Sequence, residues 1–174
     1  MNIFFLSWKP RQAAEYHCDK HVVKMIIETA QLLYAAHWVL ETPNLPPNAY
    51  KLSHKNHPSA IWTRESLANY LWLCSLGWWL CKEYQFRYNT DKKQKTHKTE
   101  DHIVWLLNNP PKMPSIDMTP VRLAMPNEYK MPDPIESYQK FYIESKLKAR
   151  NIVKYKCRIP PLFIIRYIKE NLSQ

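Results

Sequence analysis

Glycine is almost missing from this chain, which has 1 glycine in 174 residues. A Gly-rich phosphate loop and a GxGxxG dinucleotide fingerprint both need several glycines, so the sequence excludes both. A turn-rich β-sandwich or barrel is disfavoured as well, because it needs many residues with positive φ. The 14 prolines predict irregular connections between the elements instead.

CxxC pairs are also missing: the 4 cysteines are Cys18, Cys74, Cys81 and Cys157, which excludes a zinc ribbon. Cys74 and Cys81 lie in an apolar stretch and are interpreted as buried thiols, which fits a reducing compartment. The first residues lack the basic and apolar regions of a signal peptide. The most apolar window, residues 71–81, is too short to span a bilayer. We therefore expect a cytoplasmic protein that is neither secreted nor inserted in a membrane.

Acidic residues are few beside basic ones, at 15 against 25, which gives a formal net charge of +10. A basic excess in a small domain indicates a polyanionic partner: nucleic acid first, then an anionic membrane or phosphorylated metabolites. Lysine retained for solubility, or by AT-rich codon usage, would produce the same excess. With 45% hydrophobic residues, the chain has enough apolar material for one folded core.

Hydrophobic periodicity predicts an all-α fold, a single compact helical domain over residues 1–174. Residues 11–39 and 58–88 are each predicted as one long helix. The second is apolar nearly all round and is therefore expected to be the buried central helix. Residues 3–6 form a short apolar run, which is either a strand or a buried N-terminal arm.

Shorter elements follow in the second half of the chain. A short helix is expected at residues 102–107, and another after Asp133, where Pro134 and Glu136 complete a capping pattern. The C-terminal region is expected to hold a basic helix, followed by an apolar segment at residues 162–168 that packs back.

The segment YHCDKH at residues 16–21 is the sharpest local feature. His17 and His21 are spaced to share one helical face, which continues with Lys24 and Glu28. A metal site is one interpretation, with a third ligand from Glu28, His54 or His57. A phosphate and nucleotide site with a histidine as general acid or base is the second, supported by Lys20 and Lys24. Hydrogen-bonded histidines on a helix surface are the third.

Two further segments suit phosphate binding. His54, Lys55, Asn56 and His57 precede a predicted helix N-terminus, whose free N–H groups attract anions, and Arg64 would add a forked contact. Helix capping by Asn56 or His57 would explain the first segment equally. The second is a basic run with interleaved tyrosines. Its cations could neutralise phosphates while its tyrosines stack on bases. The alternative is a solvated helix face that binds nothing. Its cations are Lys146, Lys148, Arg150, Lys154, Lys156 and Arg158.

The runs AAEYHCDKHVVKMIIETAQLL, YKLSHKNHPSAIWTRES and LAMPNEYK resemble a group of small proteins of tailed phages and large DNA viruses. More distantly, the first half resembles the pyrimidine-dimer DNA glycosylase family of the endonuclease V type. The parallels are Ala14–Glu15–Tyr16, then His57–Pro58 before a long helix, then Phe86–Arg87. That resemblance implies a compact all-α DNA enzyme in which an N-terminal α-amine attacks the sugar C1′ and forms an imine. A glutamate on the first helix supports the attack, while arginines and lysines hold phosphates.

The chain departs from the family pattern at several positions. A gapless match places Cys18 where the family has its glutamate, and Asp19 would replace it only after a helix shift. The family's arginines fall on His17 and His21. Asn2 replaces the family's threonine and is bulky for methionine removal, so the free amine is expected to be that of Met1. Lys20 or Lys24 would be an alternative nucleophile if desolvated.

The first hypothesis is a DNA glycosylase, with or without lyase activity, that flips a damaged or modified base into its site in the host cytoplasm. Its reacting centre would comprise His17, Asp19, Lys20, His21 and Glu28. Phosphates would be held by Lys24, by His54, Lys55, Asn56, His57 and Arg64, and by the basic run. A non-catalytic DNA- or RNA-binding viral protein and a metal-dependent nuclease or base-modifying enzyme are the alternatives. We expect a monomer without a cofactor that binds nucleic acid, most simply DNA.

Overall fold

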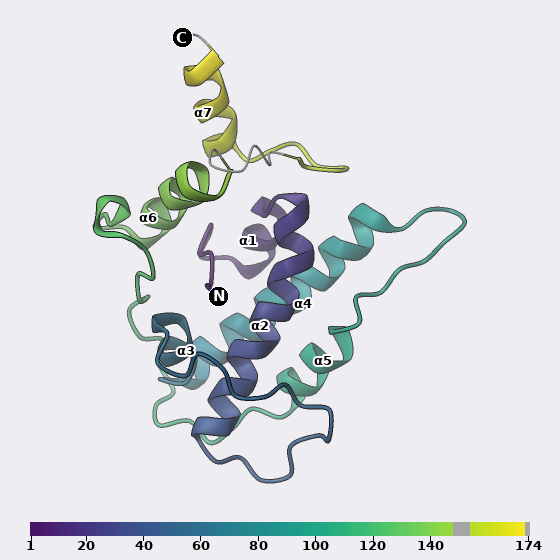
Figure 1. Cartoon of the computed structure of the whole chain (residues 1–174), viewed down its shortest axis with the longest axis vertical. Coiled ribbons are helices and arrows are strands. Elements are labelled where there is room, and N and C mark those ends of the chain that lie inside the picture. Colours follow the sequence, from purple (N-terminus) through teal and green to yellow (C-terminus); the bar gives the residue numbers. More distant parts are fainter. Residues whose placement is uncertain (148–153, 173–174) are drawn as a thin grey trace.

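The computed structural model describes residues 1–147 and 154–172, and these residues form helices and connections without a β-strand. The all-α prediction is confirmed. The helices are α1 (Pro10–Tyr16), α2 (Asp19–Val39), α3 (Pro58–Thr63), α4 (Leu67–Tyr88), α5 (Glu100–Asn108), η1 (Asn127–Tyr129), α6 (Pro134–Phe141), η2 (Tyr142–Leu147) and α7 (Leu162–Leu172). Figure 1 shows α2 and α4 in the body of the molecule and α7 at one end, beside the C-terminus. No helix in the described part is long and apolar enough to cross a membrane.

The core lies where α4 packs against α1, α2 and α5. Gly77, on α4, is placed where a Cβ would meet side-chain atoms of Thr29 and Ile103 at 2.9 Å. The chain's 1 glycine therefore lets α4 approach both α2 and α5 closely. As predicted, α4 is the buried central helix, with side chains such as Leu73 and Leu80 fully buried.

Residues 3–6 form a buried arm and not a strand. The ring of Phe5 stacks on Trp72 at 4.5 Å between centroids and meets the edge of Trp62 at 4.9 Å. These aromatic contacts hold the arm inside the molecule, so the N-terminus lies near the middle of the fold (Figure 1).

The prediction of one helix over residues 11–39 is wrong, because the chain breaks between α1 and α2. His17 and Cys18 have extended backbones, with ψ of 135° and 161°. The break is held by tertiary hydrogen bonds: Cys18 N donates to the hydroxyl of Tyr142 at 2.9 Å, and Asp19 N donates to Lys154 O at 2.9 Å. These partners come from distant sequence, so helical periodicity could not reveal the break.

The prediction of one helix over residues 58–88 is also wrong, since α3 ends at Thr63 and α4 begins at Leu67. Ser66 caps α4 by accepting a hydrogen bond from Asn69 N at 3.1 Å. The next two N–H groups, of Leu67 and Ala68, donate to the carbonyls of Ser115 and Ile116. The distant loop thus satisfies donors that a continuous helix would have used itself.

The shorter elements agree better with the sequence. The helix expected at residues 102–107 is α5, and Asp133 caps α6 by accepting from Ile135 N at 2.7 Å. The basic helix expected in the C-terminal region is wrong for residues 154–158, which lie in a non-helical connection before α7. Backbone contacts with Asp19, described below, hold that connection in place.

Candidate functional site

The α-amine of Met1 lies beside the carboxylate of Glu28, in the middle of the fold. The amine nitrogen is 3.9 Å from Glu28 Oε2, and Asn2 N donates a hydrogen bond to the same oxygen at 3.0 Å. Glu28 is buried on α2. Because the arm and α2 both contribute, the amine is held in one place against a carboxylate that can accept a proton from it.

Positive charge exceeds negative charge at this point. Lys24, one turn earlier on α2, places its Nζ 3.0 Å from Glu28 Oε1 while keeping most of its side chain exposed. Two cationic groups, the Met1 ammonium and Lys24, therefore share the single carboxylate of Glu28. The remaining positive charge favours an anionic ligand or an oxyanion that forms during a reaction.

His21, two turns before Glu28 on α2, also lines this site. Its ring stacks on Phe4 at 5.4 Å between centroids, and its Nδ1 is 2.8 Å from the hydroxyl of Tyr142. The same hydroxyl accepts the hydrogen bond from Cys18 N that holds the break between α1 and α2. The break and the orientation of the imidazole therefore depend on one side chain, Tyr142.

These groups surround a small cavity, which we call the amine cavity. Its volume is about 70 Å³, and its lining comprises Met1, Asn2, Phe4, His21, Lys24, Met25 and Glu28. A cavity of about 150 Å³ holds a benzene ring, so this one takes water or a small functional group and not a nucleobase.

Asn2 anchors the arm to two other elements. Its Oδ1 accepts a hydrogen bond from Ser59 Oγ on α3 at 3.2 Å, and its Nδ2 donates to Ala124 O at 3.0 Å. Ala124 belongs to the LAMPNEYK segment, and its own N–H donates to the hydroxyl of Tyr138 at 3.2 Å. This unusual sequence thus serves to position the N-terminus.

His57 lies at the edge of the same region. Its Nδ1 accepts a hydrogen bond from Ser59 N at 3.1 Å, so the capping interpretation is confirmed. Burial lowers the pKa of His57, the positive charges of the N-terminus and His54 lower it further, and Glu28 opposes them. His54, Lys55 and Asn56 are exposed in the loop before α3.

His17, predicted for the reacting centre, is fully buried and does not line the amine cavity. Its Nδ1 donates to Ala13 O at 2.6 Å, and no polar atom of the described residues pairs with Nε2. Burial lowers the pKa of His17 to about 4, so the ring is neutral at pH 7. The break at residues 17–18 turns this ring into the core, which is why His17 and His21 do not share one exposed face.

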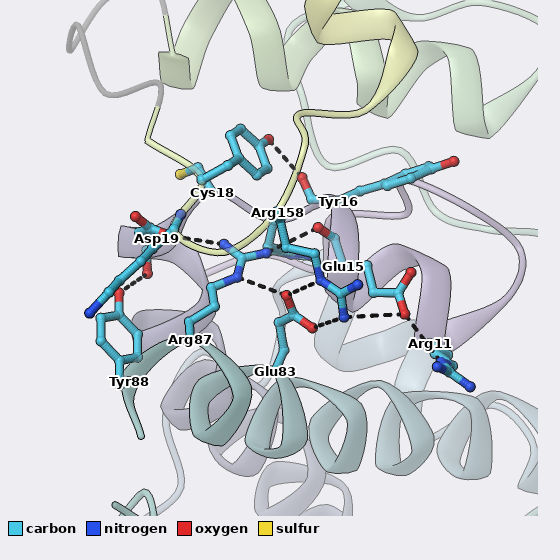
Figure 2. A network of polar contacts seen from close by, with 12 residues as sticks. Arg11, Glu15, Tyr16, Cys18, Asp19, Glu83, Arg87, Tyr88 and Arg158 are labelled. Carbon is cyan, nitrogen blue, oxygen red and sulfur yellow. Dashed lines mark hydrogen bonds and ion pairs between the residues drawn. The ribbon is translucent and has the colours of Figure 1, made fainter. Parts of the chain in front are cut away.

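Asp19 is also predicted for the reacting centre but belongs to a different site. Its Oδ1 accepts hydrogen bonds from Arg87 Nη1 at 2.9 Å and from Lys156 N at 2.8 Å. Arg87, on α4, is fully buried and also donates to Glu83 Oε1 at 2.7 Å and to Glu15 O at 3.1 Å. Figure 2 shows these groups facing one another from α1, α2, α4 and the C-terminal connection.

Arg158 closes this group of charges, which we call the Arg87 cluster (Glu15, Asp19, Glu83, Arg87 and Arg158). It binds both oxygens of Glu83 at 2.8 Å and covers the ring of Phe86 at 4.4 Å. Burial would raise the pKa of Glu83, but hydrogen bonds from Arg158 and Arg87 outweigh it and the pKa is lowered. Arg158 is therefore paired with Glu83 in this structure, and its expected contact with a phosphate stays a prediction.

The other predicted residues are dispersed. Arg64 donates to Lys55 O at 2.6 Å and closes its own loop. Lys20 and Lys154 are exposed, and the Nζ of Lys156 lies 5.6 Å from the ring centre of Tyr88. Lys148 and Arg150 lie outside the described residues, as does the side chain of Lys146. Within the described part, no three His, Cys, Asp or Glu side chains gather as metal ligands.

Sequence reasoning missed the contributions of Asn2, Phe4, Tyr142 and the Glu83–Arg87 pair. One signal was available: Glu83 and Arg87 are spaced as an i, i+4 ion pair on a helix otherwise apolar nearly all round. Such a pair has to be buried with its charges matched. The contacts of Asn2 and Tyr142 join residues more than 50 positions apart, so no local pattern reports them.

Comparison with protein-family models, with curated proteins and with solved structures gives no match for this chain.

Proposed function

We propose that this protein is a DNA glycosylase with lyase activity, in which the α-amine of Met1 is the nucleophile. The observation that carries the proposal is the placement of this amine beside the buried carboxylate of Glu28. A primary amine becomes a nucleophile when it gives up a proton, and the carboxylate of Glu28 is placed to accept that proton. The resemblance to the pyrimidine-dimer glycosylases supports the same chemistry, and Glu28 takes the role expected of a glutamate near the amine.

The reaction proceeds by attack on the deoxyribose. As the amine nitrogen bonds to C1′, the N-glycosidic bond breaks, and the base leaves with the bonding electrons and takes a proton from solvent. Glu28 accepts the proton that the amine loses and returns it to O4′ when the sugar ring opens to the imine. Transfer of a C2′ proton to a base, a role we assign to His21 because its imidazole lines the amine cavity, then expels the 3′ phosphate. Water hydrolyses the imine and frees the amine.

The charges around the cavity suit the substrate backbone. Lys24 on its rim and exposed Lys20 one turn away lie on the same helix, and Lys55 lies in the loop beside His57. Lysines near a reacting sugar neutralise the flanking phosphates and draw the strand toward the site. Since the amine cavity cannot hold a base, the sugar C1′ approaches its opening while the base stays outside it.

The test is reductive trapping on a duplex that carries one abasic site. With sodium borohydride, we expect a covalent protein–DNA adduct, and peptide mapping by mass spectrometry places the DNA on Met1. Glu28→Gln removes the proton acceptor while keeping the side chain's size, and we expect at least about a hundredfold slower trapping. Glu136→Gln, an exposed glutamate on α6, is the matched control and should trap as wild type does.

Lysine variants separate binding from chemistry. Lys24→Ala should slow trapping several-fold, whereas Lys20→Ala, which loses an exposed lysine outside the cavity lining, should reduce only DNA affinity. An adduct mapped to a lysine, or equal trapping by wild type and Glu28→Gln, would reject the role of the amine. Absence of any adduct across abasic and damaged duplexes would reject the enzyme.

A second function, binding of nucleic acid without catalysis, is favoured by the net charge of +10 together with the small size of the amine cavity. It predicts affinity that falls steeply with salt. It also predicts that Glu28→Gln binds as wild type does while no substrate yields a product.

A further inference from the structure

A groove beside the N-terminal arm has the size and chemistry that the amine cavity lacks. Its volume is about 360 Å³, well above the roughly 150 Å³ that holds a benzene ring. It lies between the end of the arm, α1 and α6, and its lining includes Ser7, Trp8, Gln12, Tyr16, Ile135 and Gln139. Flat aromatic ligands with polar edges suit such a lining.

Trp8 is the unusual side chain of this groove. Residues 2–7 of the arm are buried, yet the side chain of Trp8 is 50% exposed. Its backbone is fixed, because Trp72 Nε1 donates to Trp8 O at 2.8 Å and Lys9 N donates to Ser7 Oγ at 3.2 Å. A large exposed aromatic ring on a fixed backbone offers a stacking surface at little entropic cost.

Polar groups of the lining match the edges of a base. Gln12 Oε1 accepts from Ser7 Oγ at 2.6 Å, so the part of this amide that can serve a ligand is its NH₂ donor. Gln139 Nε2 donates to Leu6 O at 3.0 Å, which leaves its Oε1 as an acceptor. The charged members of the lining are Lys9, which is exposed, and Asp133, whose Oδ1 caps α6.

We propose that the groove beside Trp8 binds an unpaired nucleobase of the DNA strand, which stacks on the indole of Trp8. The inference rests on the proposed function and deepens it by assigning a site for a base beside the nucleotide that reacts. Trp8 comes seven positions after Met1, so the two sites lie within about 25 Å of each other. One bound strand can span them, with exposed Lys9 in the groove lining for its phosphates.

The experiment measures affinity for two labelled strands by fluorescence anisotropy. One is a 12-residue strand of thymidine, and the other is a 12-residue strand of tetrahydrofuran abasic sites, which has the same phosphates without bases. Neither strand can form an imine, so the result is independent of borohydride trapping. We expect wild type to prefer the thymidine strand.

Trp8→Ala should raise the Kd for the thymidine strand at least about fivefold and leave the Kd for the abasic strand unchanged. Trp8→Phe, which keeps a stacking ring, should stay near wild type. Phe86→Ala is the matched control, because this side chain on α4 is 52% exposed and lies outside the groove lining. Thermal unfolding of each variant checks that the fold is retained.

Equal binding of the two strands by wild type would overturn the inference. A Kd for the thymidine strand within twofold of wild type in Trp8→Ala, or an equal loss for both strands, would do the same. Such results with intact trapping on Met1 would reject the base site and leave the proposed function standing. Unchanged affinity accompanied by a dimer through this groove would assign the groove to a second copy instead.

Discussion

Two regions of α2, at Asp19 and at Glu28, use charge in opposite ways. Asp19 at its start lies in the Arg87 cluster, where each arginine and each acid has a charged partner. Glu28, nine residues later and about 14 Å along the helix, faces a cavity in which two cations share one carboxylate. A saturated cluster holds elements together, whereas an unbalanced charge beside a cavity can act on a ligand. The comparison teaches that the role of a charged residue in a motif, structural or functional, can be inferred only once its charged partners are known.

The Arg87 cluster should give the largest effect when broken. Arg87→Met removes the cation that pairs with buried Glu83 and partly exposed Asp19, after which Glu83 keeps Arg158 and Asp19 keeps the hydrogen bond from Lys156 N. Removing one partner of a buried ion pair costs about 3–5 kcal/mol, so we expect a loss of that size in the free energy of unfolding by urea denaturation. Lys24→Met, at an exposed cation, should cost less than about 1 kcal/mol. Equal losses in the two variants would contradict the contrast between the regions.

Acid should weaken the fold through His17. Its pKa is about 4 in the folded protein, below the ordinary 6.5, so its contribution to stability is fully present above pH 6.5. That contribution is lost as pH falls from 6.5 toward 4, because the unfolded chain binds the proton first, and it amounts to about 3 kcal/mol. His17→Asn, which can still donate to Ala13 O, should show a shallower fall in urea midpoint between pH 7 and pH 4.5. Part of the fall in urea midpoint should remain in His17→Asn, because burial also lowers the pKa of His37 to about 4.

Removing the side-chain hydrogen bonds of Asn2, which anchor the N-terminus, should lower the stability less than Arg87→Met does and should also slow borohydride trapping. Asn2→Leu keeps a bulky second residue, and therefore Met1, but removes the bonds to Ser59 Oγ and Ala124 O. We expect a loss of about 1–3 kcal/mol in unfolding free energy and roughly tenfold slower borohydride trapping, since misplacing a nucleophile by about 1 Å is costly. Ser59→Ala removes only one of these bonds and should slow trapping less. Trapping at the wild-type rate in Asn2→Leu would show that the arm is positioned by its aromatic contacts alone.

Local patterns in the sequence predicted the features that depend on residues close together in the chain, namely apolar helix faces and helix caps. The apolar stripes of α2 and α4, the cap of α6 by Asp133 and the cap of α3 by His57 all follow from spacings of a few positions. The buried arm was one of two expectations for residues 3–6, and its aromatic contacts with Trp62 and Trp72 decided between them.

Hydrogen bonds between residues far apart in the sequence determine the features that the sequence did not predict. The break at His17 and Cys18 depends on Tyr142 and Lys154, and these contacts turn His17 inward and draw Asp19 to Arg87. Only His21 and Glu28, of the five residues predicted for the reacting centre, therefore line the amine cavity. Spacing along a helix correctly grouped Lys24 with Glu28, because no break falls between them.

The bidentate contact between Arg158 and Glu83 has a consequence for the order in which the protein acquires its structure. During synthesis on a ribosome, α1, α2 and α4 emerge long before residue 158, so Glu83 at first has Arg87 as its sole cation and Oε2 has no partner from this cluster. Any folding of these helices before that point would leave Glu83 with Arg87 alone as its partner from the cluster. The second guanidinium of the cluster is added only once residue 158 has been synthesised.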